Sequence, residues 1–142
     1  MYTRIKTILV ADSNPDYRRL IRSVLADVEI LDADNALDAM NLLKTEKIDM
    51  IILDFRLPDK SGVEVLHWCR ANEIHVPVIF MSQDSKLQKA EEVALADCCA
   101  SLFHKPLNLK SLVEAVRAAD LKDHHENCLH HYHGMITRDV HI

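Results

Sequence analysis

Five short apolar runs alternate with stretches of helical periodicity along the chain, and this alternation limits the folds that the sequence can adopt. The runs cover residues 8–11, 28–31, 48–53, 76–81 and 100–103. Runs of this length, rich in Ile, Leu and Val, are too short for helices and predict strands buried on both faces. Strands that alternate with helices are typical of parallel βαβ units, with helices on both faces of one sheet and right-handed crossovers.

The segments between the runs carry apolar residues at the i, i+3, i+4 spacing of an amphipathic helix. The predicted helical faces are Tyr17, Leu20, Ile21, Val24 and Leu25; Ala36, Ala39, Met40 and Leu43; Val63 and Leu66; Leu87, Ala90 and Ala94; and Leu109, Leu112, Val113 and Val116. Ser13 or Asn14 before Pro15, and Ser61 before Gly62, are residue types that begin helices. The pattern ends after Asp120, so we predict one domain over residues 1–120 and a separate tail over 121–142.

Composition describes a globular chain and argues against several classes of protein. The 142 residues are 49% hydrophobic and 27% charged, which is enough for a core without disulfides. The formal net charge of -5 argues against a nucleic-acid partner, which usually needs a basic stripe. Neither a membrane span nor a signal peptide is predicted. The four cysteines lack C-x-x-C spacing, so we expect free thiols and a cytoplasmic location.

Four polar residues stand at the carboxyl ends of predicted strands: Asp12, Asp54, Ser82 and Lys105. In an open parallel sheet these ends meet at one edge, where sites form at a switch in strand order. A carboxylate can act as a nucleophile toward phosphorus, and a second one can help to hold Mg²⁺. A lysine about 4 Å from a phosphoryl oxygen would attract it by about 4 kcal/mol at an effective dielectric of 20. The set therefore suits phosphoryl transfer.

Residues 5–120 resemble the receiver domain of two-component response regulators in the spacing of motifs as well as in residue type. The matching segments are I-L-V-A-D over 8–12, I-I-L-D-F-R-L-P-D-K-S-G over 51–62, P-V-I-F-M-S over 77–82 and H-K-P over 104–106. The resemblance implies an α/β, flavodoxin-like (βα)5 fold, which is a doubly wound parallel sheet with strand order 2-1-3-4-5.

The resemblance also implies a role for each residue at the strand ends. Asp54 would accept the phosphoryl group, Lys105 would bind it, and Ser82 would be the switch hydroxyl. Asp12, Asp54 and the backbone carbonyl of Arg56 would hold Mg²⁺. The donor would be a sensor histidine kinase or a phosphotransfer protein. Output would be a contact with a downstream protein, or a homodimer, through the fourth helix, fifth strand and fifth helix. Such a domain is a signalling switch that at most catalyses its own phosphorylation and dephosphorylation.

Three positions depart from the pattern of the family. Ser13 stands where a second acid normally binds the metal, so we expect weaker Mg²⁺ binding and slower phosphotransfer. Leu102 stands where an aromatic ring normally responds to the switch, and strand alternation would point Phe103 to the opposite face. Gln83 follows Ser82 where a small residue normally leaves room for the phosphoryl group.

A pocket that lacks one acid leaves a second interpretation open, which is a phosphorylation-independent interaction module with a receiver-like fold. Asp54 alone could simply cap a turn, but Asp12 and Lys105 together favour an acidic pocket. A phosphohydrolase of similar topology would require an acid where Arg56 stands. A flavin-binding domain would require a Ser/Thr/Gly-rich loop after the first strand.

The remaining candidates concern the tail and several packing positions. Six of the nine histidines lie in 121–142, near Cys128. This tract could bind Zn²⁺ or Ni²⁺, but its spacing frames no closed site, and it could instead extend the last helix or come from an expression tag. We predict Trp68, Cys69, Cys98 and Cys99 as packing residues and Asp59 and Lys60 as turn residues.

Overall fold

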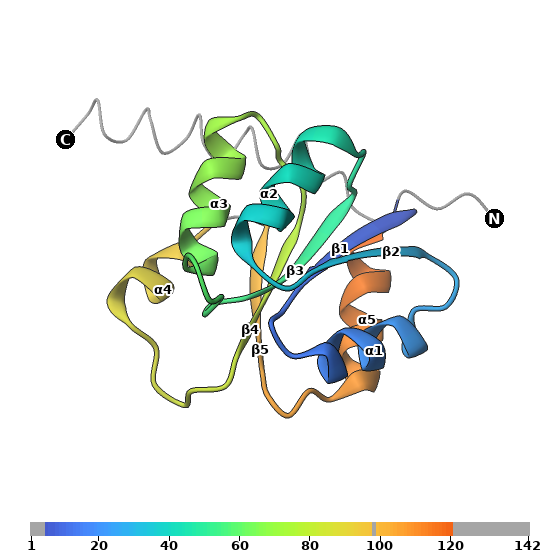
Figure 1. The fold of residues 1–142 in the computed structure, drawn as a ribbon. Helices are drawn as coiled ribbons and strands as arrows, with labels where there is room; N and C mark the ends of the chain where they lie inside the picture. Colours follow the sequence, from blue (N-terminus) through green and yellow to red (C-terminus); the bar gives the residue numbers. More distant parts are fainter. Residues whose placement is uncertain (1–4, 98, 121–142) are drawn as a thin grey trace.

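A sheet of five parallel strands forms the centre of the computed structural model, which describes residues 5–97 and 99–120 (Figure 1). The strands are β1 (Thr7–Ala11), β2 (Glu29–Ala33), β3 (Met50–Asp54), β4 (Val78–Ser82) and β5 (Ala100–His104). Their order is β2-β1-β3-β4-β5, and each neighbouring pair is parallel. The predicted flavodoxin-like topology is therefore confirmed.

Five helices alternate with these strands and cover both faces of the sheet (Figure 1). They are α1 (Pro15–Val24), α2 (Ala36–Thr45), α3 (Gly62–Ala71), α4 (Lys89–Ala94) and α5 (Leu109–Asp120). α1 contacts α5 on one face, whereas α2 contacts α3, and α3 contacts α4, on the other. This two-sided cover explains why the inner strands β1, β3 and β4 carry continuous apolar runs of four residues instead of alternating with polar residues.

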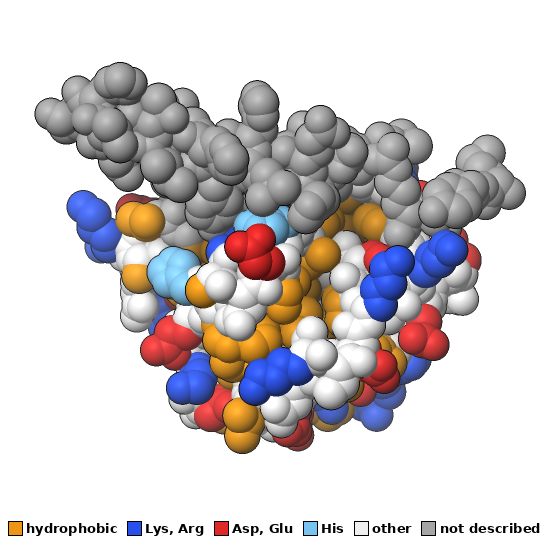
Figure 2. Space-filling view, turned by 90° about the horizontal axis from the view of Figure 1, so that it is seen from above, with side chains coloured by type: hydrophobic (Ala, Val, Ile, Leu, Met, Phe, Trp, Pro, Cys, Tyr) orange, Lys and Arg blue, Asp and Glu red, His pale blue; other side chains and the backbone are white. Residues whose placement is uncertain are grey.

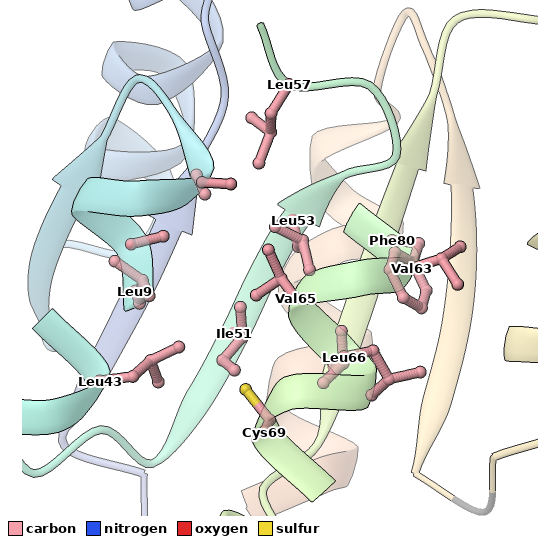
Figure 3. Close-up of a cluster of buried hydrophobic side chains, with 14 of the residues drawn as sticks. Leu9, Leu43, Ile51, Leu53, Leu57, Val63, Val65, Leu66, Cys69 and Phe80 are labelled. Atoms are coloured by element: carbon pink, nitrogen blue, oxygen red, sulfur yellow. The ribbon is translucent and has the colours of Figure 1, made fainter. Parts of the chain in front are cut away.

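Alternate residues of the inner strands pack into two separate apolar layers. In β3, Ile51 and Leu53 belong to the layer beneath α2 and α3 that Figure 3 shows, whereas Met50 and Ile52 belong to the layer beneath α1 and α5. These four side chains are at most 1% exposed. Full burial of such a side chain is worth roughly 1.5–3 kcal/mol, so β3 is anchored on both sides before it delivers Asp54 to the sheet edge.

The predicted helix starts are confirmed at α1 and α3. The Asn14 side chain caps α1 by accepting a hydrogen bond from the backbone N–H of Asp16, and Pro15 follows as the first helical residue. Ser61 caps α3 through a reciprocal capping box with Glu64. Both helices therefore begin at fixed points directly beside the ends of β1 and β3.

Two predicted helical faces were wrong in part. Leu20 is 45% exposed, because α1 turns Ile21 and Leu25 toward the sheet instead. Leu87 precedes α4, and Ala90 is exposed. The buried residue of the first turn of α4 is Glu91, whose carboxylate accepts a hydrogen bond from the backbone N–H of Gln88. Periodicity of apolar residues does not reveal a helix that buries a charged residue.

The packing predictions hold for the residues that the structure describes. Cys69 and Cys99 are buried, and Trp68 packs against the layer beneath α2 and α3. Cys98 and the His-rich tail over 121–142 lie outside the described residues. Among the described residues, no helix has the length and apolar character required to cross a membrane. On the face seen in Figure 2, acidic and basic side chains are interspersed rather than gathered into a stripe of one sign.

Candidate functional site

The carboxyl ends of four strands bring the predicted polar residues together at one edge of the sheet. Asp54 and Ser82 are the last residues of β3 and β4, and Asp12 and Lys105 follow β1 and β5 directly. These residues line a pocket of about 360 Å³. The rest of its lining is Ser13, Asn14, Arg56, Gln83 and Asp84. Residues that are far apart in the sequence therefore share a single cavity, as the strand-end rule predicts.

Lys105 bridges the two carboxylates at the centre of the pocket. Its Nζ lies 2.7 Å from Asp12 Oδ2 and 2.7 Å from Asp54 Oδ2, and its side chain is 4% exposed. Burial alone would lower the pKa of Lys105, but the close contacts with the charged carboxylates of Asp12 and Asp54 outweigh burial and hold it above its usual value. The lysine is therefore a buried, charged group that neutralises part of the acidic pocket.

Backbone N–H groups hold the second oxygen of each carboxylate. Asp12 Oδ1 accepts a hydrogen bond of 2.8 Å from the backbone N–H of Asn14. Asp54 Oδ1 accepts one of 2.8 Å from the backbone N–H of Arg56. Each acid is thus fixed between its own loop and Lys105, which sets the orientation of both carboxylates without any contribution from Ser13.

The chain that follows Asp54 packs closely enough to require a glycine. The backbone N–H of Gly62, the first residue of α3, donates to the carbonyl of Phe55 at 2.7 Å. A Cβ atom at Gly62 would lie 2.5 Å from the carbonyl oxygen of Asp54. Phe55 is fully buried, and its ring stacks on Phe80 at 4.3 Å between centroids. The loop from β3 to α3 is therefore a rigid support for Asp54.

The hydroxyl of Ser82 is engaged within its own loop. Its Oγ donates to the Asp84 carbonyl and accepts from the Asp84 backbone N–H, each at 3.2 Å. The Ser82 carbonyl accepts a hydrogen bond of 2.8 Å from the backbone N–H of Lys105, which ties the ends of β4 and β5 together. Ser82 is thus placed beside the pocket, with its hydroxyl directed to the loop that leads to α4.

Arg56 has a side-chain role that the sequence analysis missed. Its guanidinium lies 3.1 Å from Asp84 Oδ2 and 3.6 Å from Glu91 Oε2, and the Glu91 side chain is 4% exposed. Arg56 therefore connects the loop after Asp54 to the loop after Ser82 and to α4. No local pattern reveals this pairing, because its members lie on different loops. The sequence resemblance implies a role for the Arg56 backbone carbonyl and none for its side chain.

The pocket offers oxygen ligands that suit a divalent cation. Asp12 Oδ2 is buried and makes no directed hydrogen bond within the described part of the chain, although it forms the ion pair with Lys105. Carboxylate and carbonyl oxygens are the ligands that Mg²⁺ prefers, and one or two protein carboxylates suffice. The carboxylates of Asp12 and Asp54 are therefore of the type that fits Mg²⁺, and Arg56 lines the same pocket. Among the described residues, no group of three or more His, Cys, Asp and Glu side chains is arranged to hold a metal ion. The carboxylates available to a cation in this pocket are therefore few.

The other two departures from the receiver pattern are also visible in the structure. Leu102 packs against the layer beneath α2 and α3, whereas Phe103 packs against the layer beneath α1 and α5. The expected opposite orientation of these neighbours is therefore confirmed. Gln83 is exposed and lines the rim of the pocket.

Comparisons with known proteins agree on one family. The sequence model of the response regulator receiver domain matches residues 8–117. The polar-differentiation response regulator DivK of Brucella anthropi is 25% identical over 117 residues, which are 80% of this chain and 94% of that protein. The signal receiver domain of a putative LuxO repressor protein from Vibrio parahaemolyticus matches with a TM-score of 0.72 and 25% identity, over 81% of this chain and 89% of that one. A CheY-like receiver domain protein from Methanospirillum hungatei shares the fold with a TM-score of 0.75 at 21% identity, over 87% and 98%.

Proposed function

This chain belongs to the response regulator receiver domain family, and from that premise we propose that it is a phospho-accepting switch of a two-component phosphorelay. A sensor histidine kinase or a phosphotransfer protein donates the phosphoryl group, and Asp54 accepts it. The observation that carries the proposal is the contact of Lys105 with both Asp12 and Asp54 at 2.7 Å inside one open pocket. In this proposal the receiver domain comprises residues 1–120 and acts in the cytoplasm.

The transfer is a nucleophilic substitution at phosphorus. A bond forms between an Asp54 carboxylate oxygen and phosphorus while the P–N bond of a phosphohistidine donor breaks. The imidazole nitrogen leaves with the electron pair of that bond and takes up a proton from solvent. Lys105 already contacts the acceptor carboxylate, so its ammonium group lies close enough to bind an oxygen of the incoming phosphoryl group.

Asp12, Asp54 and the Arg56 carbonyl are the residues that hold Mg²⁺ in this proposal. When bound, the cation neutralises negative charge on the phosphoryl oxygens. Ser13 contributes a neutral oxygen where the family usually has an acid, so binding is weaker than in receivers with the full acidic set. Replacing Ser13 with Asp is expected to tighten Mg²⁺ binding, as measured by calorimetric titration.

Ser82 acts as the switch in this proposal. Its hydroxyl exchanges the contacts with Asp84 for a phosphoryl oxygen, and the populations of two conformations of the loop before α4 shift. Arg56 links this loop to α4, so the change reaches the face formed by α4, β5 and α5. Output is a protein–protein contact on that face, with a downstream target or with a second copy of the chain.

The test is incubation with a small phosphodonor and Mg²⁺, followed by intact mass. Wild type is expected to gain one phosphoryl group, and Asp54→Ala is expected to gain none. Asp59→Ala is the matched control, because it removes another carboxylate from the same connecting loop and should leave phosphorylation in place. Phosphorylation of Ser13→Asp is also measured at high Mg²⁺. A gain of phosphate there, where wild type gains little, indicates a weak metal site, whereas no gain indicates that Asp54 is not an acceptor. An adduct that persists in Asp54→Ala sinks the proposal.

A phosphorylation-independent interaction module is the second candidate. Ser13 favours it, because this position offers a neutral oxygen where receivers usually carry an acid. Such a module would gain no phosphate in wild type or in Ser13→Asp at any Mg²⁺ concentration. That pair of results would replace the first proposal with this one.

A further inference from the structure

The ammonium group of Lys105 has a third neighbour besides the two carboxylates. The ring centroid of Tyr17, from the first turns of α1, lies 4.3 Å from Lys105 Nζ. A cation at this distance is attracted by the ring quadrupole, and the attraction is stronger where water is excluded. The Lys105 side chain is 4% exposed, so this contact belongs to the stronger, desolvated kind.

The start of α1 fixes the position of Tyr17 relative to the pocket. Asn14 caps that helix, and its backbone N–H donates to Asp12 Oδ1. Nη1 of Arg18, the next residue along α1, donates to the Asp12 carbonyl at 2.5 Å. Tyr17 is half-buried and belongs to neither apolar layer among the described residues. Its ring is therefore placed over the lysine by the loop that also holds Asp12, not by the core.

We propose that Tyr17 is a positioning residue for phosphoryl transfer, and that its ring keeps Lys105 in place while the lysine changes partners. The inference rests on the proposed function, in which Asp54 accepts the phosphoryl group. Asp54 loses a charged oxygen when it is phosphorylated, and in the proposed function Asp12 is also a ligand for Mg²⁺. Among the contacts of the ammonium group within residues 5–97 and 99–120, the Tyr17 ring takes no part in these changes.

The first experiment measures initial rates of phosphorylation from phosphoramidate at saturating Mg²⁺. Tyr17→Phe retains the ring and is expected to stay within about twofold of wild type, whereas Tyr17→Leu removes it and is expected to slow the maximal rate by about tenfold. The Mg²⁺ concentration for half-maximal rate stays unchanged, because Asp12 and Asp54 are intact. Leu20→Ala, an exposed change on the same helix, is the matched control. A wild-type rate in Tyr17→Leu, or equal losses in Tyr17→Phe and Tyr17→Leu, overturns the inference.

A second measurement does not depend on phosphorylation. Urea unfolding of Tyr17→Leu, Lys105→Met and the double variant forms a double-mutant cycle. If the ring acts on the lysine, Tyr17→Leu raises the unfolding equilibrium constant about fivefold less when Lys105 is already Met. Equal effects in both backgrounds overturn the ring–lysine interaction. If the double-mutant cycle shows coupling but wild type gains no phosphate, the proposed function is overturned, and with it the role of Tyr17 in transfer.

Discussion

Gly62 is the position where one added methyl group would disturb Asp54 most directly. A Cβ atom there would lie 2.5 Å from the carbonyl oxygen of Asp54, 3.1 Å from Phe55 Cα and 3.3 Å from the carbonyl carbon of Asp54. Optimal contacts of carbon atoms lie at about 3.5–4.0 Å. All three atoms belong to the backbone at the buried end of β3, so none can move aside by changing a rotamer. Gly62→Ala therefore must displace either α3 or Asp54.

Two effects of opposite sign determine the stability of Gly62→Ala. Alanine in the first turn of a helix gains roughly 0.5–1 kcal/mol over glycine, because less backbone entropy is lost on folding. Overpacking a fixed core costs typically about 1–3 kcal/mol, and a contact with immobile backbone belongs at the upper end. The clash also strains the 2.7 Å hydrogen bond from Gly62 to Phe55, which is worth about 1 kcal/mol. We expect a net loss of about 1–3 kcal/mol in the free energy of unfolding.

Urea unfolding measures that loss, and phosphodonor labelling with intact mass measures the consequence for Asp54. Ser61→Ala is the matched control, because it removes the cap of the same helix at a cost of about 1 kcal/mol without touching the backbone of Asp54. Gly62→Ala should lose phosphorylation, whereas Ser61→Ala should keep most of it. A Gly62→Ala variant as stable as wild type would show that the steric reasoning is wrong.

Three further predictions test the scaffold. The Asp59 carboxylate accepts hydrogen bonds from the backbone N–H groups of Ala36 and Leu37, which lower its pKa below the ordinary 3.8. Because folding lowers this pKa, the stability that the Asp59 carboxylate contributes is present above pH 3.8 and is lost as the pH falls through the folded pKa. Asp59→Asn should therefore lose less stability than wild type as the pH falls, as measured by urea unfolding from about pH 6 to about pH 2. The guanidinium of Arg70 lies 3.0 Å from the buried Asp97 carboxylate. Arg70→Met removes this cation and should lower the free energy of unfolding in urea by about 3–5 kcal/mol. A loss under about 1 kcal/mol would contradict the view that this buried ion pair stabilises the fold. Burial, partly offset by the charge of Arg70, raises the pKa of the Cys69 thiol to about 12, so alkylation at about pH 8 followed by peptide mapping should leave Cys69 unmodified until urea is added.

The parts of the fold that the sequence predicts are those in which local pattern and burial agree. β3 is apolar on both faces because helices cover both, and this gives a continuous run that ends at Asp54. The strand-end rule then brings Asp12 and Lys105 to the same edge although they are far apart in the chain. Asn14 and Ser61 are helix caps, and caps are read from short local signals.

The parts that the sequence does not predict are pairings between side chains on different elements. Asp59 is a turn residue by local reasoning, yet its carboxylate caps α2, which begins 23 residues earlier in the chain. Arg56 meets Glu91, and Tyr17 lies over Lys105, because the fold brings their loops and helices together. None of these pairs leaves a spacing signal in the sequence, since the partner of each residue is set by topology and not by helical or strand period.

We expect Ser13, which stands where receivers usually carry an acid, to affect Mg²⁺ binding more than the acceptor Asp54. Asp54 is oriented by the backbone N–H of Arg56, by Lys105 and by the close packing of Gly62, and Ser13 contributes to none of these contacts. If Asp54 is the acceptor, as we propose, these contacts keep its geometry for nucleophilic attack intact, and we expect the missing charge to weaken only the attraction of the pocket for a cation. A higher Mg²⁺ concentration should compensate for this weaker binding by mass action. Phosphorylation of wild type should rise with Mg²⁺ well beyond the concentration that saturates Ser13→Asp, and the two maximal rates should converge; a wild-type rate that reaches a low plateau at the same Mg²⁺ concentration would place the defect in the acceptor itself.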